Sequence, residues 1–580
     1  MQPTPSQPGG SSFTRDRGII LLAAFVIVLP LLLRGASCGH DLDFHMTNWM
    51  EVAEQWRHGI LWPRWAFTPA WGAGEPRFIF YPPLSWLLGG ILGLAIPIPF
   101  VPAAFTFVSL TACGLTMRRV AAEWTAPPCA LLAAIFYMAN PYMLFCVYER
   151  CAFGELLAAA WMPLLVLAAL RTPISLRSVA IPVALLWLTN APSAVMSCYL
   201  FALIALLRLA LLYRDAFSGR RMQAMLPFAL RAIGGIALGI GLAAFYIVPA
   251  SWERRWVQID LAIAPYSRVQ DSTLFRQTPD PFHDAVLRTA SFIALILLAL
   301  AAALLFGAWR RHGRSHRHLV ILLGASVLCI GFALTPLSLF AWQHLPQLRF
   351  IQFPWRLLAL LGILCSLLLA LASRGKRHIL LAAAIVLPLA LVPPAYHQFS
   401  SRCFDEDVPA TQLADFRAGD GIDPTDEYTP KTADNDPLVD SVYSWWLTDD
   451  PASLSRHPAT QNGSIDFSLA QSFHVPATHA NFLVIRLRNY PAWQVRVNGN
   501  AAHIVPRNDG YLAIQLPPGE ADVTVHYRTI MPDDIIGILL SLIALTILLL
   551  LQRGTLHRGM NALSIPILKP APFLPNALPS

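Results

Sequence analysis

Long apolar runs separated by short polar segments dominate this sequence. A helix needs about 17 to 25 apolar residues to cross the hydrocarbon of a bilayer. We expect one membrane-spanning helix in each run that meets or approaches this length: 18–33, 98–117, 127–147, 153–170, 178–190, 193–213, 228–249, 289–309, 318–335, 354–373, 378–396 and 533–552. The pattern therefore predicts a polytopic α-helical membrane protein with about 12 transmembrane helices.

Two apolar stretches are ambiguous by length. The run 18–33 follows Arg15 and Arg17 and fits either a signal peptide or a first membrane helix. We favour the helix, because Arg34 and Gly35 fit a lipoprotein-type cleavage site poorly. The stretch 84–97 is only about 14 residues long and contains glycines, so we expect a re-entrant or interfacial segment there.

Basic residues gather in the short segments between the runs. If the N-terminus is cytoplasmic, the clusters all fall on the cytoplasmic side, as the positive-inside rule requires. These clusters are Arg118/Arg119, Arg171/Arg177, Arg214/Arg220/Arg221, Arg310/Arg311/Arg314/Arg317, Arg374/Lys376/Arg377 and Arg553. Counting 84–97 as a span would reverse this pattern. We therefore expect a multi-pass protein of the inner membrane, with a disordered cytoplasmic tail over 1–17 and a second cytoplasmic tail over 553–580.

Four regions are then expected outside: 34–83, 148–154, 251–288 and 397–532. The last of these follows the transmembrane domain, 18–396, and precedes the last helix, 533–552. Apolar residues alternate in it on either side of Asn498-Gly499, Asp509-Gly510 and Pro518-Gly519. Such period-two patterns between tight turns are typical of antiparallel hairpins. We therefore expect an extracytoplasmic β-sandwich over 397–532.

Composition and charge support this picture. Charged residues are 13% of the chain, against roughly 25% in soluble proteins, which excludes a soluble enzyme, a disordered chain and a disulfide scaffold. The net charge of +8 comes from basic residues between apolar runs, so it is a topology signal and implies no nucleic-acid partner. Most cysteines lie within the runs. Only Cys38 and Cys403 fall clearly in one outer space, and a disulfide between them stays an open possibility.

The first outer loop carries more charge than a connector needs. Asp41 and Asp43 lie two residues apart, and His45 follows two residues later. Such a pattern can hold a divalent cation such as Mg²⁺ or Mn²⁺, or one carboxylate can act as a base. The alternative is that one of the two aspartates simply caps a helix that begins near His45.

Two further segments offer charged groups at helix ends. Glu149, Arg150 and Glu155 either belong to a site, or Glu149 and Arg150 pair at the membrane interface. Gln352 and Arg356 lie near the outer end of a later span, where an arginine either binds a phosphate or anchors the helix. We expect Asn190 to be a turn residue, and the histidine- and arginine-rich segment 311–318 to be a solvated loop.

Six motifs give the chain a family resemblance: HDLDFH, GILWPRW, GEPRFIFYPPLSW, YERCAFGE, LRFIQFPWRLL and NYPAWQVRVNG. It resembles the bacterial membrane proteins named for 6-pyruvoyl-tetrahydropterin synthase, whose architecture is similar to that of the GT-C glycosyltransferases. Pterin chemistry itself is not expected, because a catalytic zinc needs three protein ligands and the HDLDFH motif offers only the two histidines His40 and His45.

The GT-C resemblance implies an inverting transfer of a sugar from a polyprenyl-phosphate carrier to a glycan, lipid or protein acceptor on the outer face. It implies Asp41, Asp43 and Glu155 as catalytic residues, with Asp41 the first choice as base. The expected substrate-binding residues are His45, Arg77, Tyr81, Glu149, Arg150, Gln352 and Arg356. The alternative is a non-catalytic component or a transporter of envelope polysaccharide assembly.

Overall fold

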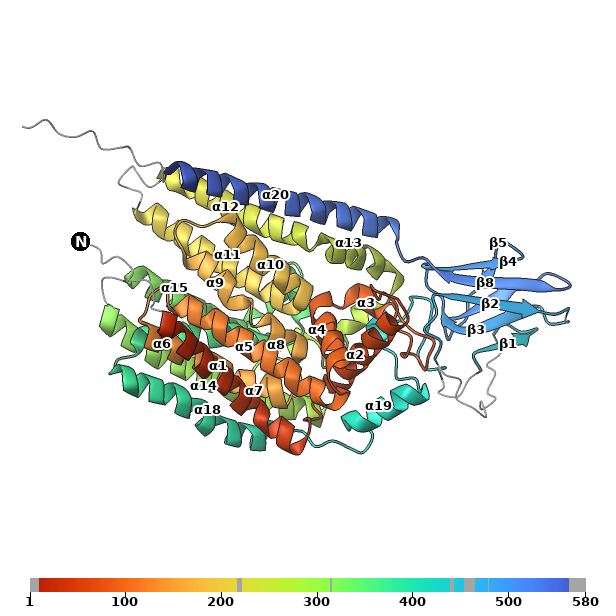
Figure 1. Cartoon of the computed structure of the whole chain (residues 1–580), viewed down its shortest axis with the longest axis horizontal. Coiled ribbons are helices and arrows are strands. Elements are labelled where there is room, and N and C mark those ends of the chain that lie inside the picture. The colour runs from red at the N-terminus through yellow and green to blue at the C-terminus, as the bar shows by residue number, and fades with distance from the viewer. Residues whose placement is uncertain are drawn as a thin grey trace, which may run out of the picture.

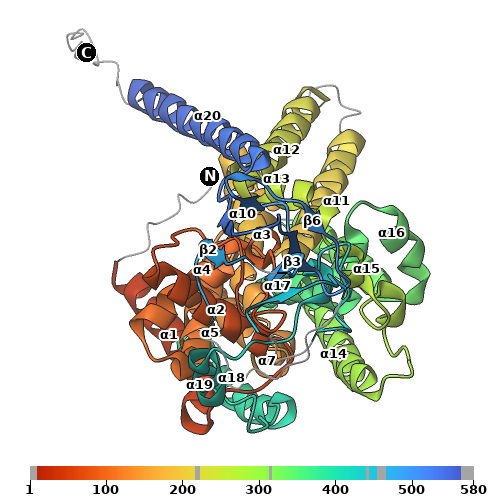
Figure 2. The same ribbon diagram turned by 90° about the vertical axis from the view of Figure 1, so that its right-hand side faces the viewer.

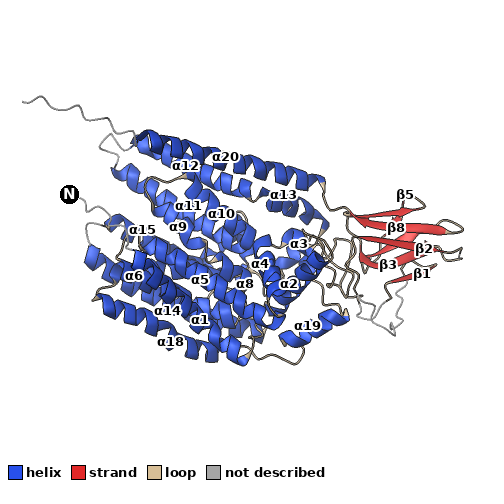
Figure 3. Cartoon of the chain, viewed as in Figure 1, coloured by secondary structure: helices blue, strands red, loops and turns tan. Residues whose placement is uncertain are grey.

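The computed structural model describes residues 10–215, 222–312, 316–438, 443–452, 465–477 and 479–562. Long helices form a bundle, and a β domain lies at one end of it, which we call the β end (Figures 1 and 3). Within the described residues, ten helices are long and apolar enough to cross a membrane, or eleven if a pair bent by 93° is one span. The predicted class, a polytopic α-helical membrane protein, is confirmed.

The helices of the bundle follow the predicted runs. They are α1 (Gly10–Arg34), α5 (Val101–Ala121), α6 (Pro127–Ala139), α7 (Pro141–Tyr148), α8 (Phe153–Ala158), α9 (Met162–Leu170), α10 (Leu176–Thr189), α11 (Ala191–Asp215), α12 (Met222–Leu242), α14 (Pro281–His312), α15 (Arg317–Ala333), α16 (Leu339–His344), α17 (Leu358–Ala372), α18 (Arg377–Phe399) and α20 (Pro532–Ala562). Shorter helices gather near the β end: α2 (Leu42–Arg57), α3 (Arg77–Phe80), α4 (Pro83–Ala95), α13 (Ala244–Glu253) and α19 (Pro409–Ala418).

Two of the twelve predicted spans fall short of a straight crossing. The run 178–190 is α10, with 14 residues, and 318–335 is α15, the first arm of the bent pair. The stretch 84–97 forms the 13-residue helix α4, which packs against α2. The length of this helix agrees with the short segment expected there.

Both predicted tails are partly helical. Helix α1 begins at Gly10, and α20 continues to Ala562. The expectation of a disordered tail over 1–17 is therefore wrong for residues 10–17, and the expected tail 553–580 begins as helix. Residues 1–9 and 563–580 lie outside the described part of the chain, as do 313–315 of the basic loop.

The four regions predicted to lie outside contact one another at the β end. A disulfide joins Cys38 to Cys403, which settles the pairing that the sequence left open. Isolated β-bridges join Pro69 to Ile422 and Val257 to Pro430. The backbone N–H of Asp41 donates to the carbonyl of Arg150 over 3.0 Å. These contacts gather the segments onto one surface, and Figure 2 looks directly onto it.

The β domain consists of two four-stranded sheets, ordered β1-β3-β7-β6 and β2-β8-β4-β5, in which all paired strands are antiparallel. Side chains of β4 and β8 alternate strictly between buried and exposed, as the period-two pattern predicted. The described strands begin only at Trp445, so the first part of the predicted range 397–532 holds α19 and loops. The strands are β1 (Trp445–Thr448), β2 (Ala470–Val475), β3 (Phe482–Arg488), β4 (Trp493–Val497), β5 (Asn500–Ala501), β6 (Ile504–Val505), β7 (Tyr511–Gln515) and β8 (Ala521–Tyr527).

The tryptophan-rich first loop completes the core of the β domain. Trp65 is 1% exposed, and its ring lies 5.7 Å from those of both Tyr490 and Trp493. Gly74 permits this packing, because its φ is +76° and a Cβ there would lie 2.1 Å from the indole nitrogen of Trp65. The loop and the sandwich therefore form one packed unit, and the loop cannot move independently of the β domain.

Replacing Trp65 tests this shared core. We expect Trp65→Ala to lower the free energy of unfolding by about 3–5 kcal/mol, the usual loss for a buried aromatic side chain. Trp62→Ala is the matched control, because Trp62 is 44% exposed. The measurement is thermal unfolding of the purified full-length protein, and equal losses in the two variants would contradict the shared core.

Candidate active site

A cavity of about 530 Å³ opens at the β end, where all four predicted outer regions meet. Three carboxyl groups and three guanidinium groups line it, together with His45 and several tyrosines. Of the residues predicted as site residues, those that line the cavity are Asp41, His45, Tyr81, Arg150, Glu155, Gln352 and Arg356. The long-range contacts of the fold therefore bring together motifs that lie more than 300 residues apart in the chain.

Backbone pairing fixes the position of Asp41. The N–H groups of His40 and Asp41 donate to the carbonyls of Glu149 and Arg150, over 3.3 and 3.0 Å. Gly39 makes this approach possible, since a Cβ there would lie 2.1 Å from the carbonyl oxygen of Glu149. The first outer loop is thus tied directly to the turn that carries Arg150.

The carboxylate of Asp41 has no bonding partner among the described residues. Asp41 occupies the N-cap position of α2, yet its side chain makes no capping hydrogen bond. Among the residues that the structure describes, none forms a hydrogen bond or an ion pair with its carboxylate. The interpretation of Asp41 as a helix cap is therefore wrong, and a half-buried carboxylate remains at the cavity wall.

Asp43 does not join Asp41 in the cavity. It is exposed, and its Oδ1 accepts a 2.5 Å hydrogen bond from Gln412 of α19. Residues two apart on a helix point in different directions, and this places Asp43 on the α19 side of α2. Asp43 therefore lies outside the cavity that Asp41 lines, and its catalytic role and a cation shared with Asp41 stay predictions.

Arg77 and Glu149 were predicted to bind substrate, but neither lines the cavity. The Arg77 guanidinium is buried and donates to Glu75, Asn48 and Thr425 over 2.7, 3.0 and 2.9 Å. It therefore fastens the first loop to the segment before the β domain. Glu149 pairs with His40 at 3.8 Å and not with Arg150, so the expected interfacial pair is also absent from the described contacts of these residues.

Arg150, Glu155 and Arg356 form one buried charge cluster. Arg150 Nη1 lies 2.7 Å from Glu155 Oε2, and Arg356 Nε lies 3.7 Å from the same oxygen. The hydroxyl of Tyr142 donates to Glu155 Oε1 over 2.5 Å. Because its oxygens are engaged in this way, Glu155 holds the two arginines in place. Glu155 also lines the cavity, and its catalytic role stays a prediction.

Gln352 and Asn190 shape the rim of the cavity. The Gln352 amide donates to the carbonyl of Ala262 over 2.6 Å and accepts from Arg356 Nη1 over 3.1 Å. It therefore links the loop 251–288 to the charge cluster. Asn190 Oδ1 accepts from the N–H of Ser193 at the start of α11, which confirms its role as a turn residue, although Asn190 also lines the cavity.

His45 lies in an aromatic cluster. Its ring is 5.3 Å from that of Phe153, 5.9 Å from that of Tyr81 and 5.8 Å from that of Trp49. Burial lowers the pKa of His45 to about 4, against 6.5 for a free histidine, so the ring is neutral at physiological pH. A neutral imidazole at the cavity can donate or accept a hydrogen bond, but it supplies no charge.

The sequence did not single out two charged residues of the cavity, Arg254 and Glu427. Arg254 follows α13, and its side chain is exposed without a hydrogen-bond or ion-pair partner among the described residues. Glu427 lies in a short turn before the β domain, and burial raises the pKa of its carboxyl. Arg254 could have been suspected, because the adjacent Arg254 and Arg255 in an expected outer loop oppose the positive-inside trend.

A second groove adjoins the cavity and has a volume of about 710 Å³. The two share Ser251, Arg254, Ile259 and Phe350 as lining residues. The other charged residues that line the groove are Arg255, Asp260, Arg349 and Lys431. The groove is therefore a basic extension of the cavity.

Comparison with solved structures finds an arabinofuranosyltransferase and an oligosaccharyltransferase. The arabinofuranosyltransferase AftD from Mycobacteria is 17% identical with a TM-score of 0.42, and the match covers 71% of this chain and 29% of that chain. The Archaeoglobus fulgidus oligosaccharyltransferase is 13% identical with a TM-score of 0.33, over 68% of this chain and 56% of that chain. The chain thus spans less than a third of AftD and just over half of the oligosaccharyltransferase.

No protein-family model matches the chain, and no curated protein matches its sequence. The resemblance to proteins named for 6-pyruvoyl-tetrahydropterin synthase therefore gains no support from these comparisons.

The buried His45 predicts a specific pH dependence of stability. The unfolded chain binds a proton at His45 below about pH 6.5 and the folded chain only below about pH 4, so stability is lost as the pH falls through this window. The loss attributable to His45 is about 3 kcal/mol. We expect His45→Phe to flatten the pH profile of unfolding between pH 6.5 and pH 4. His58→Phe, at a half-exposed position, is the control variant.

Proposed function

We propose that this protein is a membrane glycosyltransferase that transfers a sugar from a polyprenyl-phosphate carrier to an envelope glycan, lipid or protein. One observation carries the proposal. An unpaired carboxylate, Asp41, lies in the same cavity as the guanidinium groups of Arg150, Arg254 and Arg356. A base for the acceptor and cations for a phosphate leaving group are the two requirements of this reaction.

In the proposed reaction, Asp41 takes the proton of an acceptor hydroxyl. The acceptor oxygen attacks the anomeric carbon of the donor sugar, and the bond between that carbon and the phosphate oxygen breaks. The electron pair leaves with the polyprenyl phosphate, and the attack from the opposite face inverts the anomeric centre. Asp41 suits the role of base because its carboxylate is unpaired. The oxygens of Glu155, in contrast, already contact Arg150, Arg356 and Tyr142.

The cavity wall suits a lipid-linked donor. Helices α10, α11 and α13 contribute apolar residues to the cavity wall, among them Trp187, Val195 and Ile247. These helices are parts of the bundle, so a polyprenyl chain can extend along apolar side chains while its phosphate remains beside Arg254. The unpaired Arg254 is the natural ligand for this phosphate, because an arginine fork matches phosphate oxygens.

The proposal requires no metal step. The arginines of the cavity supply the positive charge, and Asp43 contacts Gln412 outside the cavity. We further propose that the β end faces the extracytoplasmic side of the inner membrane, with both termini in the cytoplasm. The basic groove next to Arg254 is then open to a glycan acceptor.

The two aspartates of the first loop provide a matched test. We expect Asp41→Asn to reduce sugar transfer by 10²- to 10⁴-fold, the usual range for loss of a general base. Asp43→Asn should keep nearly full activity, because Asp43 lies outside the cavity. The assay follows loss of polyprenyl-phosphate sugar and gain of glycosylated acceptor by purified protein in lipid vesicles.

The same assay distinguishes the proposed enzyme from the alternative function. A non-catalytic component or a transporter would move lipid-linked sugar or glycan across the vesicle membrane without forming a glycosidic bond. Unchanged glycan transfer in the properly inserted Asp41→Asn variant, or transport without transfer in the wild type, would overturn the proposed enzyme.

A further inference from the structure

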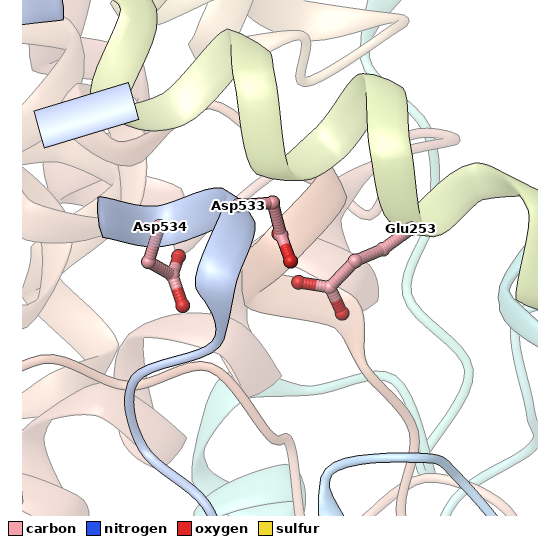
Figure 4. Close-up of side chains that lie close together, drawn as sticks. All are labelled: Glu253, Asp533 and Asp534. Carbon is pink, nitrogen blue, oxygen red and sulfur yellow. The ribbon is translucent and has the colours of Figure 1, made fainter. Parts of the chain in front are cut away.

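A second cluster of carboxylates lies at the β end, where α13 ends and α20 begins. Glu253, Asp533 and Asp534 are all buried, with exposed fractions of 0%, 3% and 5%. Each offers a carboxylate oxygen, and these oxygens lie within 4.8 Å of one another. Figure 4 shows the cluster between the end of α13 and the first turn of α20. None of the three residues lines the cavity of the candidate active site.

One cation in the described structure contacts this cluster. Arg64 of the first outer loop donates to Glu253 Oε1 over 2.6 Å and to Asp534 Oδ1 over 2.5 Å. The hydroxyl of Tyr490, between β3 and β4 of the β domain, donates to Glu253 Oε2 over 2.5 Å. If all three carboxyl groups are ionised, one guanidinium leaves two negative charges without compensation. Buried charges that lack a partner are strongly destabilising.

Asp533 is the member of the cluster that has no partner. Its side chain is buried, and neither of its oxygens accepts a hydrogen bond from the described residues. Its carboxylate points toward Glu253 (Figure 4). A buried carboxylate with two unsatisfied oxygens, aimed at a second carboxylate, is an arrangement that a bound cation would satisfy.

We propose that Glu253, Asp533 and Asp534 bind a calcium ion that fastens α20 and the β domain to the rest of the β end. Calcium takes oxygen ligands only and accepts irregular geometry, which suits three carboxylates from two helix ends, whereas magnesium demands a near-ideal octahedron. The ion supplies the two positive charges that the cluster lacks after Arg64 is counted.

The site has a structural consequence for the cavity. Glu253 directly precedes Arg254, which lines the candidate active site, and Arg64 directly precedes Trp65 of the shared core. An ion bound here therefore fixes the end of α13, the start of α20 and the first outer loop relative to one another. Glu253, Asp533 and Asp534 are positioning residues, because they touch neither the cavity nor a reacting group.

The competing arrangement is a shared proton. Burial raises the pKa of the Glu253 carboxyl to about 7, although Arg64 opposes the shift. A proton held between Glu253 and Asp533 would remove one of the excess charges without any ion. The two arrangements predict different effects of Asp533→Asn. An amide can replace a protonated carboxyl, but it lacks the negative charge of a carboxylate that binds calcium.

Terbium luminescence tests ion binding at this place. Tb³⁺ occupies calcium sites, and nearby aromatic rings such as Tyr490 and Trp65, whose centroids lie 5.7 Å apart, can sensitise its emission. We expect the full-length wild type, stripped with EDTA, to show sensitised Tb³⁺ emission that Ca²⁺ displaces. Asp533→Asn and Glu253→Gln should lose this emission. Asp260→Asn, at a position 81% exposed, is the control and should retain it.

Thermal unfolding supplies an independent measurement. We expect Ca²⁺ to raise the melting temperature of the stripped wild type by several degrees at pH 8 and to leave Asp533→Asn and Glu253→Gln unaffected. Emission retained in both variants would overturn the proposal. It would also be overturned if Ca²⁺ has no effect on the wild type while Asp533→Asn raises the melting temperature, which identifies a shared proton. Neither outcome bears on sugar transfer, so the proposed function is tested separately.

Discussion

The buried contact between Arg150 and Glu155 is the interaction on which the cavity depends. Arg150 also stacks on Trp355, with its guanidinium carbon 4.7 Å from the ring centroid, and Arg356 approaches the same oxygen of Glu155 as Arg150 does. The turn after α7 and the segment before α17 are therefore held by one carboxylate. Removing one member of a buried ion pair leaves a charge that the surroundings cannot solvate, which destabilises a protein by about 3–5 kcal/mol. Glu155 thus holds together residues from two separate segments of the site.

The first outer loop connects the charge cluster to the β domain. Near its start, Asp41 is tied to Arg150 through the backbone, and further along Trp65 enters the sandwich core. Arg77 connects the same loop to Thr425, close to Glu427 of the cavity. A single segment of chain therefore contacts the charge cluster, the cavity wall and the sandwich. This accounts for its unusual density of charged and aromatic residues, which topology alone does not require.

The sequence could predict the parts of the molecule that depend on local pattern. Apolar run length gave the helices, period-two alternation gave the strands, and the isolated D-x-D motif led to Asp41. It could not separate Asp41 from Asp43, because the contact between Asp43 and Gln412 joins segments 369 residues apart. Arg77 and Trp65 belong to charged and aromatic motifs, and only tertiary packing assigns them to structural roles. The sequence around Glu427 did not indicate a site residue, because it is typical of a short polar turn. Only the tertiary structure places Glu427 at the cavity.

The charges of the cavity suit a singly charged phosphodiester better than a neutral ligand. Asp41 and Glu155 together balance Arg150 and Arg356, which leaves Arg254 and Glu427. Burial raises the pKa of the Glu427 carboxyl, and the exposed guanidinium of Arg254 carries a positive charge at the rim. An anion that enters beside Arg254 neutralises this charge without disturbing the buried cluster. The carboxylate of Asp41 stays unpaired in the same step, and this is the state in which it can accept a proton.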